Sequence, residues 1–209
     1  DLSSSVLKLV ARQAQTARFA SVLEPTCGEG SLLAAAASTF PEAKLLGFEL
    51  DAAHAAVAQQ RLGRRAKVVQ ADFFSVDWEK ELSSLPSPLL LVGNPPWVTT
   101  ATLGVVAARN SPPKRSRGGM TGLEAKTGRS NFDISEWMLE RLLEATIASG
   151  KIFYMAMLCK AAVARRLLET AHQRRWKLNG SIYTIDAKRH FAASVEAVLL
   201  LLSSSETEV

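Results

Sequence analysis

The chain alternates short, continuously apolar runs with helix-like stretches along almost its whole length. Seven runs are predicted strands: 21–23, 44–49, 66–70, 88–93, 152–158, 181–186 and 195–202. Five stretches with apolar residues at helical spacing are predicted helices: 6–19, 31–38, 52–62, 132–148 and 160–173. Strands that are apolar on both faces and alternate with helices are typical of a parallel sheet covered by helices on both sides. In such sheets ligands bind beyond the carboxyl ends of the strands.

Length and composition narrow the class of protein. The chain has 209 residues, which predicts one domain, and its 47% hydrophobic and 22% charged residues exclude a disordered chain. No apolar run approaches the roughly 18 residues that a membrane span needs. Two cysteines, Cys27 and Cys159, cannot form a disulfide framework, so we expect a cytoplasmic protein with no membrane association.

Positive charge is concentrated in one polar segment. The net charge of +5 and an isoelectric point near 9.4 favour a polyanionic partner without specifying one. Residues 98–130 form a predicted long loop that carries one acid, Glu124. Its cations are Arg109, Lys114, Arg115, Arg117, Lys126 and Arg129. Such a loop suits contacts with nucleic-acid phosphates, although a solvated loop has the same composition.

The first three predicted strands end in residues suited to a ligand with polar groups. The first is followed by Glu24-Pro25-Thr26-Cys27-Gly28-Glu29-Gly30, whose glycines permit a tight turn, or equally a ligand's close approach. Leu33 stands where a dinucleotide fingerprint has its third glycine, which disfavours a pyrophosphate site. Glu49 ends the second strand, where an acid can accept hydrogen bonds from ribose hydroxyls, and Asp51 is a predicted helix cap. Asp72-Phe73 after the third strand offers an acid for an adenine amino group and a ring for the purine face.

The fourth strand ends in Asn94-Pro95-Pro96-Trp97, the most informative tetrapeptide of the chain. The two prolines fix the backbone and lack N–H groups, so carbonyl oxygens are left to accept from a ligand. The Asn94 side chain adds an acceptor, and together these oxygens can hold both hydrogens of an amino group. Trp97 offers a face on which a planar base can stack.

With these residues in this order, the chain resembles adenine-N6 DNA methyltransferases. The resemblance rests on 22–30, Phe48–Asp51, Ala71–Phe73 and Gly93–Trp97, and continues in Gly128–Asp133 and His190–Val195. The motif order, with the cofactor motif first, is similar to that of the gamma group of restriction–modification enzymes. The resemblance implies a Rossmann-like class I methyltransferase fold, with a seven-stranded, mostly parallel sheet, helices on both faces and an antiparallel last strand.

The resemblance also implies roles for individual residues. S-adenosylmethionine would contact Glu24, Pro25, Thr26, Cys27, Gly28, Gly30, Glu49, Leu50, Asp72 and Phe73. Asn94, Pro95, Pro96 and Trp97 would form the catalytic motif, and Trp97 and Phe191 would sandwich a base flipped out of DNA. The resemblance implies no metal and no covalent nucleophile, and packing is the favoured role of Cys27.

Two features depart from the family pattern. Leu2 and Ser3 stand where the family has a Thr-Pro near the cofactor. The segment 98–130 is short for a target-recognition domain, so 1–209 is interpreted as a single catalytic domain whose target recognition comes from elsewhere in a longer protein or from a partner.

Other functions stay open at this point. RNA adenine, cytosine N4 and a protein glutamine amide present the same amino-group chemistry as adenine in DNA. A module that binds cofactor or nucleic acid without catalysis is a further alternative.

Overall fold

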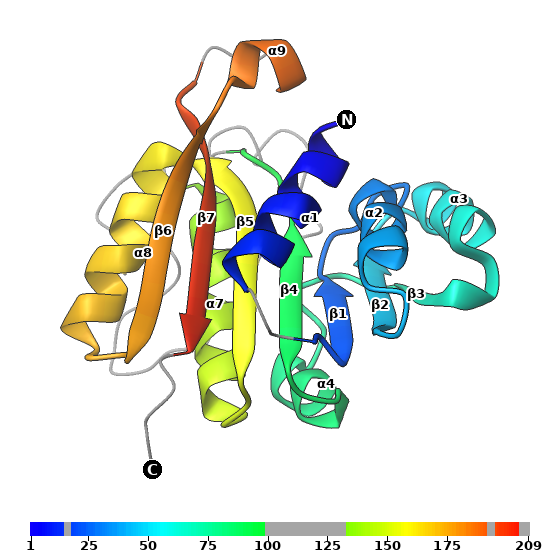
Figure 1. Ribbon diagram of the computed structural model, residues 1–209, viewed down its shortest axis with the longest axis horizontal. Coiled ribbons are helices and arrows are strands. Elements are labelled where there is room, and N and C mark those ends of the chain that lie inside the picture. The colour runs from blue at the N-terminus through cyan, green and yellow to red at the C-terminus, as the bar shows by residue number, and fades with distance from the viewer. Residues whose placement is uncertain (15–17, 99–132, 192–194, 205–209) are drawn as a thin grey trace.

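A seven-stranded sheet forms the centre of the computed structural model, which describes residues 1–14, 18–98, 133–191 and 195–204 (Figure 1). The strands are β1 (Ser21–Glu24), β2 (Lys44–Glu49), β3 (Ala66–Gln70), β4 (Leu89–Gly93), β5 (Phe153–Lys160), β6 (Leu178–Ile185) and β7 (Ala197–Ser204). Their order across the sheet is β3-β2-β1-β4-β5-β7-β6. β1 to β5 run parallel, and β7 pairs antiparallel with β5 and β6. This confirms the predicted mostly parallel sheet with an antiparallel last strand.

Helices cover both faces of the sheet, as predicted. The helices are α1 (Leu2–Gln13), α2 (Ser31–Thr39), α3 (Ala52–Leu62), α4 (Trp78–Ser84), α7 (Ile134–Ala148), α8 (Ala161–Gln173) and α9 (Ala187–Phe191), with a 3-10 turn at Gly63–Arg65. α1, α2 and α3 pack in one hydrophobic cluster, and α4, α7 and α8 pack in the other. The short helix α9 joins β6 to β7 and lies beyond the end of the sheet (Figure 1).

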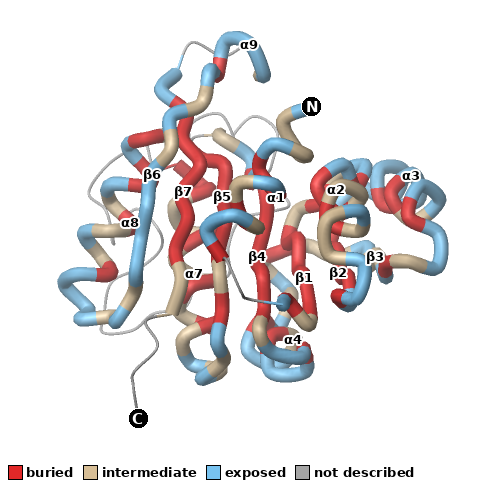
Figure 2. Tube along the Cα trace, viewed as in Figure 1, coloured by how far each residue is buried: buried red, intermediate tan, exposed pale blue. Residues whose placement is uncertain are grey.

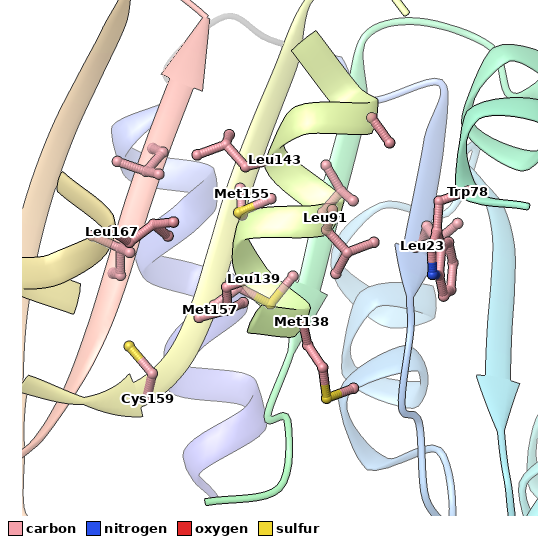
Figure 3. Close-up of a cluster of buried hydrophobic side chains, with 14 of the residues drawn as sticks. Leu23, Trp78, Leu91, Met138, Leu139, Leu143, Met155, Met157, Cys159 and Leu167 are labelled. Carbon is pink, nitrogen blue, oxygen red and sulfur yellow. The ribbon is translucent and has the colours of Figure 1, made fainter. Parts of the chain in front are cut away.

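The central strands contribute alternate residues to the two clusters. In β4, Leu89 and Leu91 pack with α4 and α7, whereas Leu90 and Val92 pack with the cluster of α1. All four of these side chains have no exposed surface. Figure 3 shows the cluster around Leu91 and Met155, and Figure 2 shows the buried central strands between exposed outer helix faces. Burial on both faces explains why these strands read as unbroken apolar runs.

Several predicted element boundaries are wrong and two helices were not predicted. The predicted helix 6–19 ends at Gln13, and residues 18–19 are not helical. α1 begins at Leu2 rather than residue 6, because the Asp1 carboxylate caps it by accepting from the Ser4 N–H at 2.7 Å. Residues 78–84 carry no helical prediction, since seven residues are too few to show periodicity, yet they form α4 with Asp77 as its cap. The five-residue α9 was missed for the same reason. β6 begins at Leu178 rather than residue 181, because its pairing with β7 extends to Ser204.

The residues predicted to begin α3 and to end α7 are confirmed. Asp51 caps α3 by accepting from the N–H groups of Ala53 and His54, both at 2.9 Å. Gly150 follows α7 with a φ of 65°. No helix in the part of the chain that the structure describes is long and apolar enough to cross a membrane.

Candidate active site at the carboxyl ends of the strands

The strand order reverses between β1 and β4, and this topological switch point is where open α/β sheets bind ligands. β1 and β4 are hydrogen-bonded neighbours, so the loops that follow them lie side by side. Their contact is close: a Cβ added at Gly93 would lie 3.4 Å from Pro25 Cδ and 3.2 Å from Met157 Sδ. The tetrapeptide after β4 therefore begins directly beside the glycine-containing loop after β1.

The loop after β1 is held against the end of β2. The Cys27 N–H donates to the Phe48 carbonyl at 2.8 Å, and a Cβ at Gly47 would clash with Leu33 Cδ1 at 2.6 Å. Gly28 and Gly30 have φ values of 52° and 77°, which disfavour residues with a Cβ. The turn thus depends on Gly28 and Gly30 for its conformation, and Gly47 of β2 allows Leu33 and Cys27 to approach closely.

Glu49 ties the ends of β1 and β2 together through its carboxylate. One oxygen accepts from the Gly28 N–H and the other from the Asp51 N–H, both at 2.8 Å. A carboxylate has about four acceptor sites, so two such bonds leave capacity for ligand hydroxyls. The Ala71 N–H donates to the Glu49 carbonyl at 2.8 Å, which places the residues after β3 next to the same point.

Two polar groups near the end of β1 lack hydrogen-bond partners among the described residues. They are Glu24 Oε2 and the Thr26 hydroxyl, and both atoms are buried. Burial raises the pKa of Glu24 well above its usual range, a main-chain hydrogen bond at Leu33 lowers it, and the charge of Glu49 adds to the rise. Buried polar atoms are normally paired, so this pair of atoms is suited to a polar ligand group.

Cys27 is buried within the same loop. Burial raises the pKa of its thiol to about 12, with the negative charges of Glu24 and Glu49 acting in the same direction. The thiol is therefore protonated at neutral pH, and a protonated thiol is a poor nucleophile. The geometry agrees with a packing role.

The residues after β3 only partly match the expectation for an adenine site. Asp72 is half-buried, and its Oδ1 accepts from the Phe74 N–H at 3.0 Å. The Phe73 ring is 5% exposed and contacts Trp78 with 4.7 Å between ring centroids. Packing against Trp78 covers most of this ring, and its contact with a purine face stays a prediction. Leu50, by contrast, is 50% exposed at the end of β2.

The tetrapeptide after β4 presents its polar side chain to solvent. Asn94 is exposed, Pro95 is buried, Pro96 is exposed and Trp97 is half-buried. Asn94 is therefore an exposed residue at the switch point. The buried Pro95 fixes the backbone beneath it.

Trp97 lies against Phe191, a residue 94 positions further along the chain. Their ring centroids are 4.7 Å apart and the ring planes meet at 63°. The structure thus brings the two predicted base-binding rings together, but in direct edge contact, with no room for a base between them. The Trp97 indole N–H also donates to the Leu158 carbonyl of β5 at 3.3 Å.

One charged residue beside the site, Lys160, has no place in the sequence prediction, whereas its partner Asp133 belongs to a predicted motif. Lys160 Nζ lies 2.8 Å from Asp133 Oδ2 and donates to the Trp97 carbonyl at 3.2 Å. Asp133 belongs to the Gly128–Asp133 motif and caps α7 by accepting from the Ser135 N–H. Lys160 carries no sequence signal beyond its place at the end of a strand.

The predicted cations of 98–130 all lie outside the described residues. Within the described residues, Lys188, Arg189 and His190 are exposed on α9, directly before Phe191. The same described ranges contain no cluster of three or more His, Cys, Asp or Glu side chains able to hold a metal.

Comparison with known proteins points to methyltransferases. No family model matches the chain. It is 37% identical over 186 residues to the Type II methyltransferase M.NspV of Nostoc sp., an alignment that covers 86% of this chain and 38% of the relative. The chain thus spans about two fifths of the length of this curated relative. Among solved structures, a METTL16 MTase domain superposes with a TM-score of 0.64 at 13% identity, covering 97% of this chain and 81% of that one. TrmN from Thermus thermophilus superposes with a TM-score of 0.58 at 16% identity, covering 97% of this chain and 49% of that one.

The sheet order, the antiparallel last strand and the loop at the switch point define a class I methyltransferase fold. Within that class, the chain is similar to the Type II methyltransferase M.NspV over most of its own length.

Proposed function

We propose that this chain is the catalytic domain of a DNA methyltransferase that modifies the N6 amino group of adenine with S-adenosylmethionine as cofactor. The observation that carries the proposal is the Asn94–Trp97 tetrapeptide at the switch point, with Asn94 exposed and Trp97 in contact with Phe191. The similarity to a Type II methyltransferase supports it.

The residues after β1 to β3 fit the proposed cofactor chemically. Glu24, Glu49 and Asp72 supply carboxyl groups near one edge of the sheet, and the Thr26 hydroxyl lacks a partner among the described residues. The Glu49 carboxylate would accept from ribose hydroxyls, Asp72 from the cofactor adenine, and the exposed Leu50 would supply apolar contact. When bound, S-adenosylmethionine would supply a methyl group on a positively charged sulfur. The amino nitrogen would form a bond to this methyl carbon as the carbon–sulfur bond breaks, so that a neutral thioether leaves and one amino proton is lost to solvent.

The chain's contribution to catalysis is to hold the target amino group. The Asn94 side-chain oxygen and the Pro95 carbonyl would accept its two hydrogens, which raises electron density on the nitrogen. Placing that nitrogen in line with the methyl group lowers the barrier by positioning. A base must leave the duplex to reach these acceptors, and Trp97 and Phe191 are the rings available to receive it. Because the two rings touch each other here, base entry requires them to separate.

Contact with the nucleic-acid backbone is proposed for two groups of cations. The loop cations Arg109, Lys114, Arg115, Arg117, Lys126 and Arg129 follow the tetrapeptide in sequence. Lys188 and Arg189 are exposed on α9 immediately before Phe191. Phosphate contacts of this kind position a duplex without reading its sequence. Recognition of a specific site is assigned to a further domain or a partner, in line with the greater length of the curated relative.

Transfer of labelled methyl groups tests the proposal. The chain is incubated with labelled S-adenosylmethionine and, in parallel, unmethylated genomic DNA, total RNA or a protein extract, followed by nucleoside analysis. We expect label in N6-methyladenine from DNA. Label in RNA, in a glutamine side chain or in N4-methylcytosine would instead assign one of the alternative acceptors. Cofactor binding by calorimetry without transfer to any acceptor would favour a non-catalytic module or a dependence on a recognition domain.

A further inference from the structure

A largely buried ion pair lies behind the tetrapeptide and makes direct contact with it. Lys160 Nζ is 2.8 Å from Asp133 Oδ2 and 3.2 Å from the Trp97 carbonyl oxygen. The side chains of Lys160 and Asp133 are 24% and 6% exposed, respectively. Lys160 ends β5 and Asp133 precedes α7, so the start of one element and the end of the next meet at Trp97.

The helix caps do not explain this pair. Asp133 caps α7 through Oδ1, which accepts from the Ser135 N–H at 3.0 Å and from the Ser135 hydroxyl at 2.6 Å. The oxygen that faces Lys160 is the other one, Oδ2. Lys160 stands at the first cap position of α8 but makes no side-chain cap. A buried ion pair is a weak source of stability compared with apolar packing, so the pair needs another explanation.

Both the backbone and the side chain of Trp97 are hydrogen-bonded to β5. Its carbonyl accepts from the Lys160 ammonium, and its indole N–H donates to the Leu158 carbonyl. Next along the chain, the Val98 carbonyl accepts from the Ile134 N–H at 3.0 Å, directly after Asp133. These three bonds fix both the backbone and the ring of the residue that follows Asn94-Pro95-Pro96.

We propose that Lys160, held by Asp133, is a positioning residue for methyl transfer, which fixes the Trp97 backbone and thereby the acceptors Asn94 and Pro95. This inference rests on the proposed function. Lys160 itself touches neither the target amino group nor the cofactor in this assignment. Its loss displaces the acceptors, and misplacement of reacting groups by about 1 Å can cost about 10²-fold in rate.

Three variants separate positioning from a merely structural role. Lys160→Met leaves Asp133 buried without its partner and is expected to lower the melting temperature. The double variant Lys160→Met/Asp133→Asn removes both charges while the introduced amide oxygen can still cap α7, so its melting temperature is expected to recover. Lys160→Arg keeps the charge and donors.

The kinetic prediction is a split between turnover and cofactor binding. The double variant is expected to lose about 10²-fold in kcat while its Kd for S-adenosylmethionine changes by less than about three-fold. Lys160→Arg is expected to recover part of the turnover. A double variant with both normal stability and a kcat within about two-fold of the unaltered chain would overturn the proposal.

A spectroscopic measurement tests the same point without activity. The indole N–H signal of Trp97, assigned in a ¹⁵N spectrum with a Trp97→Phe variant, reports its bond to Leu158. In the double variant this signal is expected to shift, while the signals of Trp78, Trp137 and Trp176 stay in place. If the unaltered chain methylates no acceptor, kcat values cannot be compared, and this signal alone decides whether Lys160 positions Trp97. An unchanged Trp97 signal would refute the positioning.

Discussion

The candidate site has two halves that are held in place by different contacts. The cofactor half consists of the residues at the ends of β1, β2 and β3, and the target half consists of the Asn94–Trp97 tetrapeptide after β4. Around β1 and β2 the contacts are local: Glu49 accepts from Gly28, 21 residues earlier, and from Asp51, two residues later. After β4 the contacts are distant, since Trp97 is held by Leu158, Lys160 and Phe191, which lie 61, 63 and 94 positions away. The first half is a structure of glycines, main-chain groups and one carboxylate. The second depends on side chains supplied by β5 and α9.

This difference suggests a division of labour. The proposed cofactor site is built from β1, β2 and β3, which are neighbours in the sheet. A target site assembled from β4, β5 and the β6–β7 connection requires the whole sheet. Changes in the second half should therefore affect turnover and target binding, and changes in the first half should affect cofactor affinity and local stability.

The largest expected effect lies in the target half. Asn94→Ala removes the exposed acceptor at the switch point, and loss of one preorganised hydrogen-bonding group at a reacting centre typically costs about 10²- to 10³-fold in kcat. Labelled methyl transfer measures kcat, and calorimetry measures the Kd for S-adenosylmethionine, which is expected to change by less than about two-fold. Asn179→Ala, at an exposed asparagine of β6, is the matched control and should retain full turnover. An equal loss of turnover in Asn94→Ala and Asn179→Ala would contradict the proposed role of Asn94.

The next effect lies in the cofactor half. Glu49→Ala removes the carboxylate that accepts from Gly28 and Asp51 and is proposed to hold the ribose. Hydrogen bonds to charged groups contribute about 1.5–3 kcal/mol each, so the Kd for S-adenosylmethionine should rise about 10- to 100-fold.

Asp51→Ala provides the control for Glu49. Asp51 caps α3 without being placed in the cofactor site, so this variant should have a lower melting temperature and an unchanged Kd. If Glu49→Ala leaves the Kd for S-adenosylmethionine unchanged, the Glu49 carboxylate only stabilises the loop and does not bind the cofactor.

The same division explains how much could be predicted from the sequence. The parallel sheet was predictable because strands such as β4 are buried on both faces and read as unbroken apolar runs. The tight turn after β1 was predictable because its backbone conformation favours glycine at Gly28 and Gly30. The attachment of Trp97 to Lys160 was not, because a lysine at a strand end has no distinctive local pattern. The place of the Phe73 ring was not predictable either, because a ring beside an acid can equally face the core, where this one packs on Trp78.

The salt dependence of DNA binding tests whether the exposed cations of α9 contact phosphates. Lys188→Gln/Arg189→Gln removes two exposed cations beside Phe191. If both contact phosphates, the slope of log K against log salt should become shallower by about 1 to 2, and affinity should fall similarly for all sequences. Arg64→Gln/Lys67→Gln removes the same charge from an exposed region at the β3 edge and should leave the slope unchanged. Equal changes in both double variants would indicate that net charge, rather than position, controls binding.

A pH effect is expected in the cofactor half. Burial raises the pKa of Glu24, so the folded chain resists ionisation that the unfolded chain undergoes near the ordinary value of 4.5. The stability associated with the protonated group is fully present below pH 4.5 and is lost as pH rises through the folded pKa. Glu24→Gln keeps the shape without the charge, so it should raise the melting temperature at about pH 8 relative to the unaltered chain, and the gain should shrink towards about pH 4. A gain independent of pH would contradict this account.

The smallest effect compares two glycines within the cofactor loop. Both Gly28→Ala and Gly30→Ala place a Cβ at positive φ, which costs about 1–2 kcal/mol in each case. They differ in space: a Cβ at Gly28 meets nothing within 4 Å, whereas one at Gly30 lies 3.1 Å from Leu62 Cδ1 and 3.2 Å from Ala58 Cβ. Gly30→Ala should therefore lower the free energy of unfolding by about 1 kcal/mol more than Gly28→Ala, measured by urea denaturation. Gly28→Ala should instead have the larger effect on the cofactor Kd, because the space beside Gly28 is open and its N–H donates to the Glu49 carboxylate. The opposite ranking in both measurements would mean that the loop is limited by packing against α3 rather than by the space it leaves for a ligand.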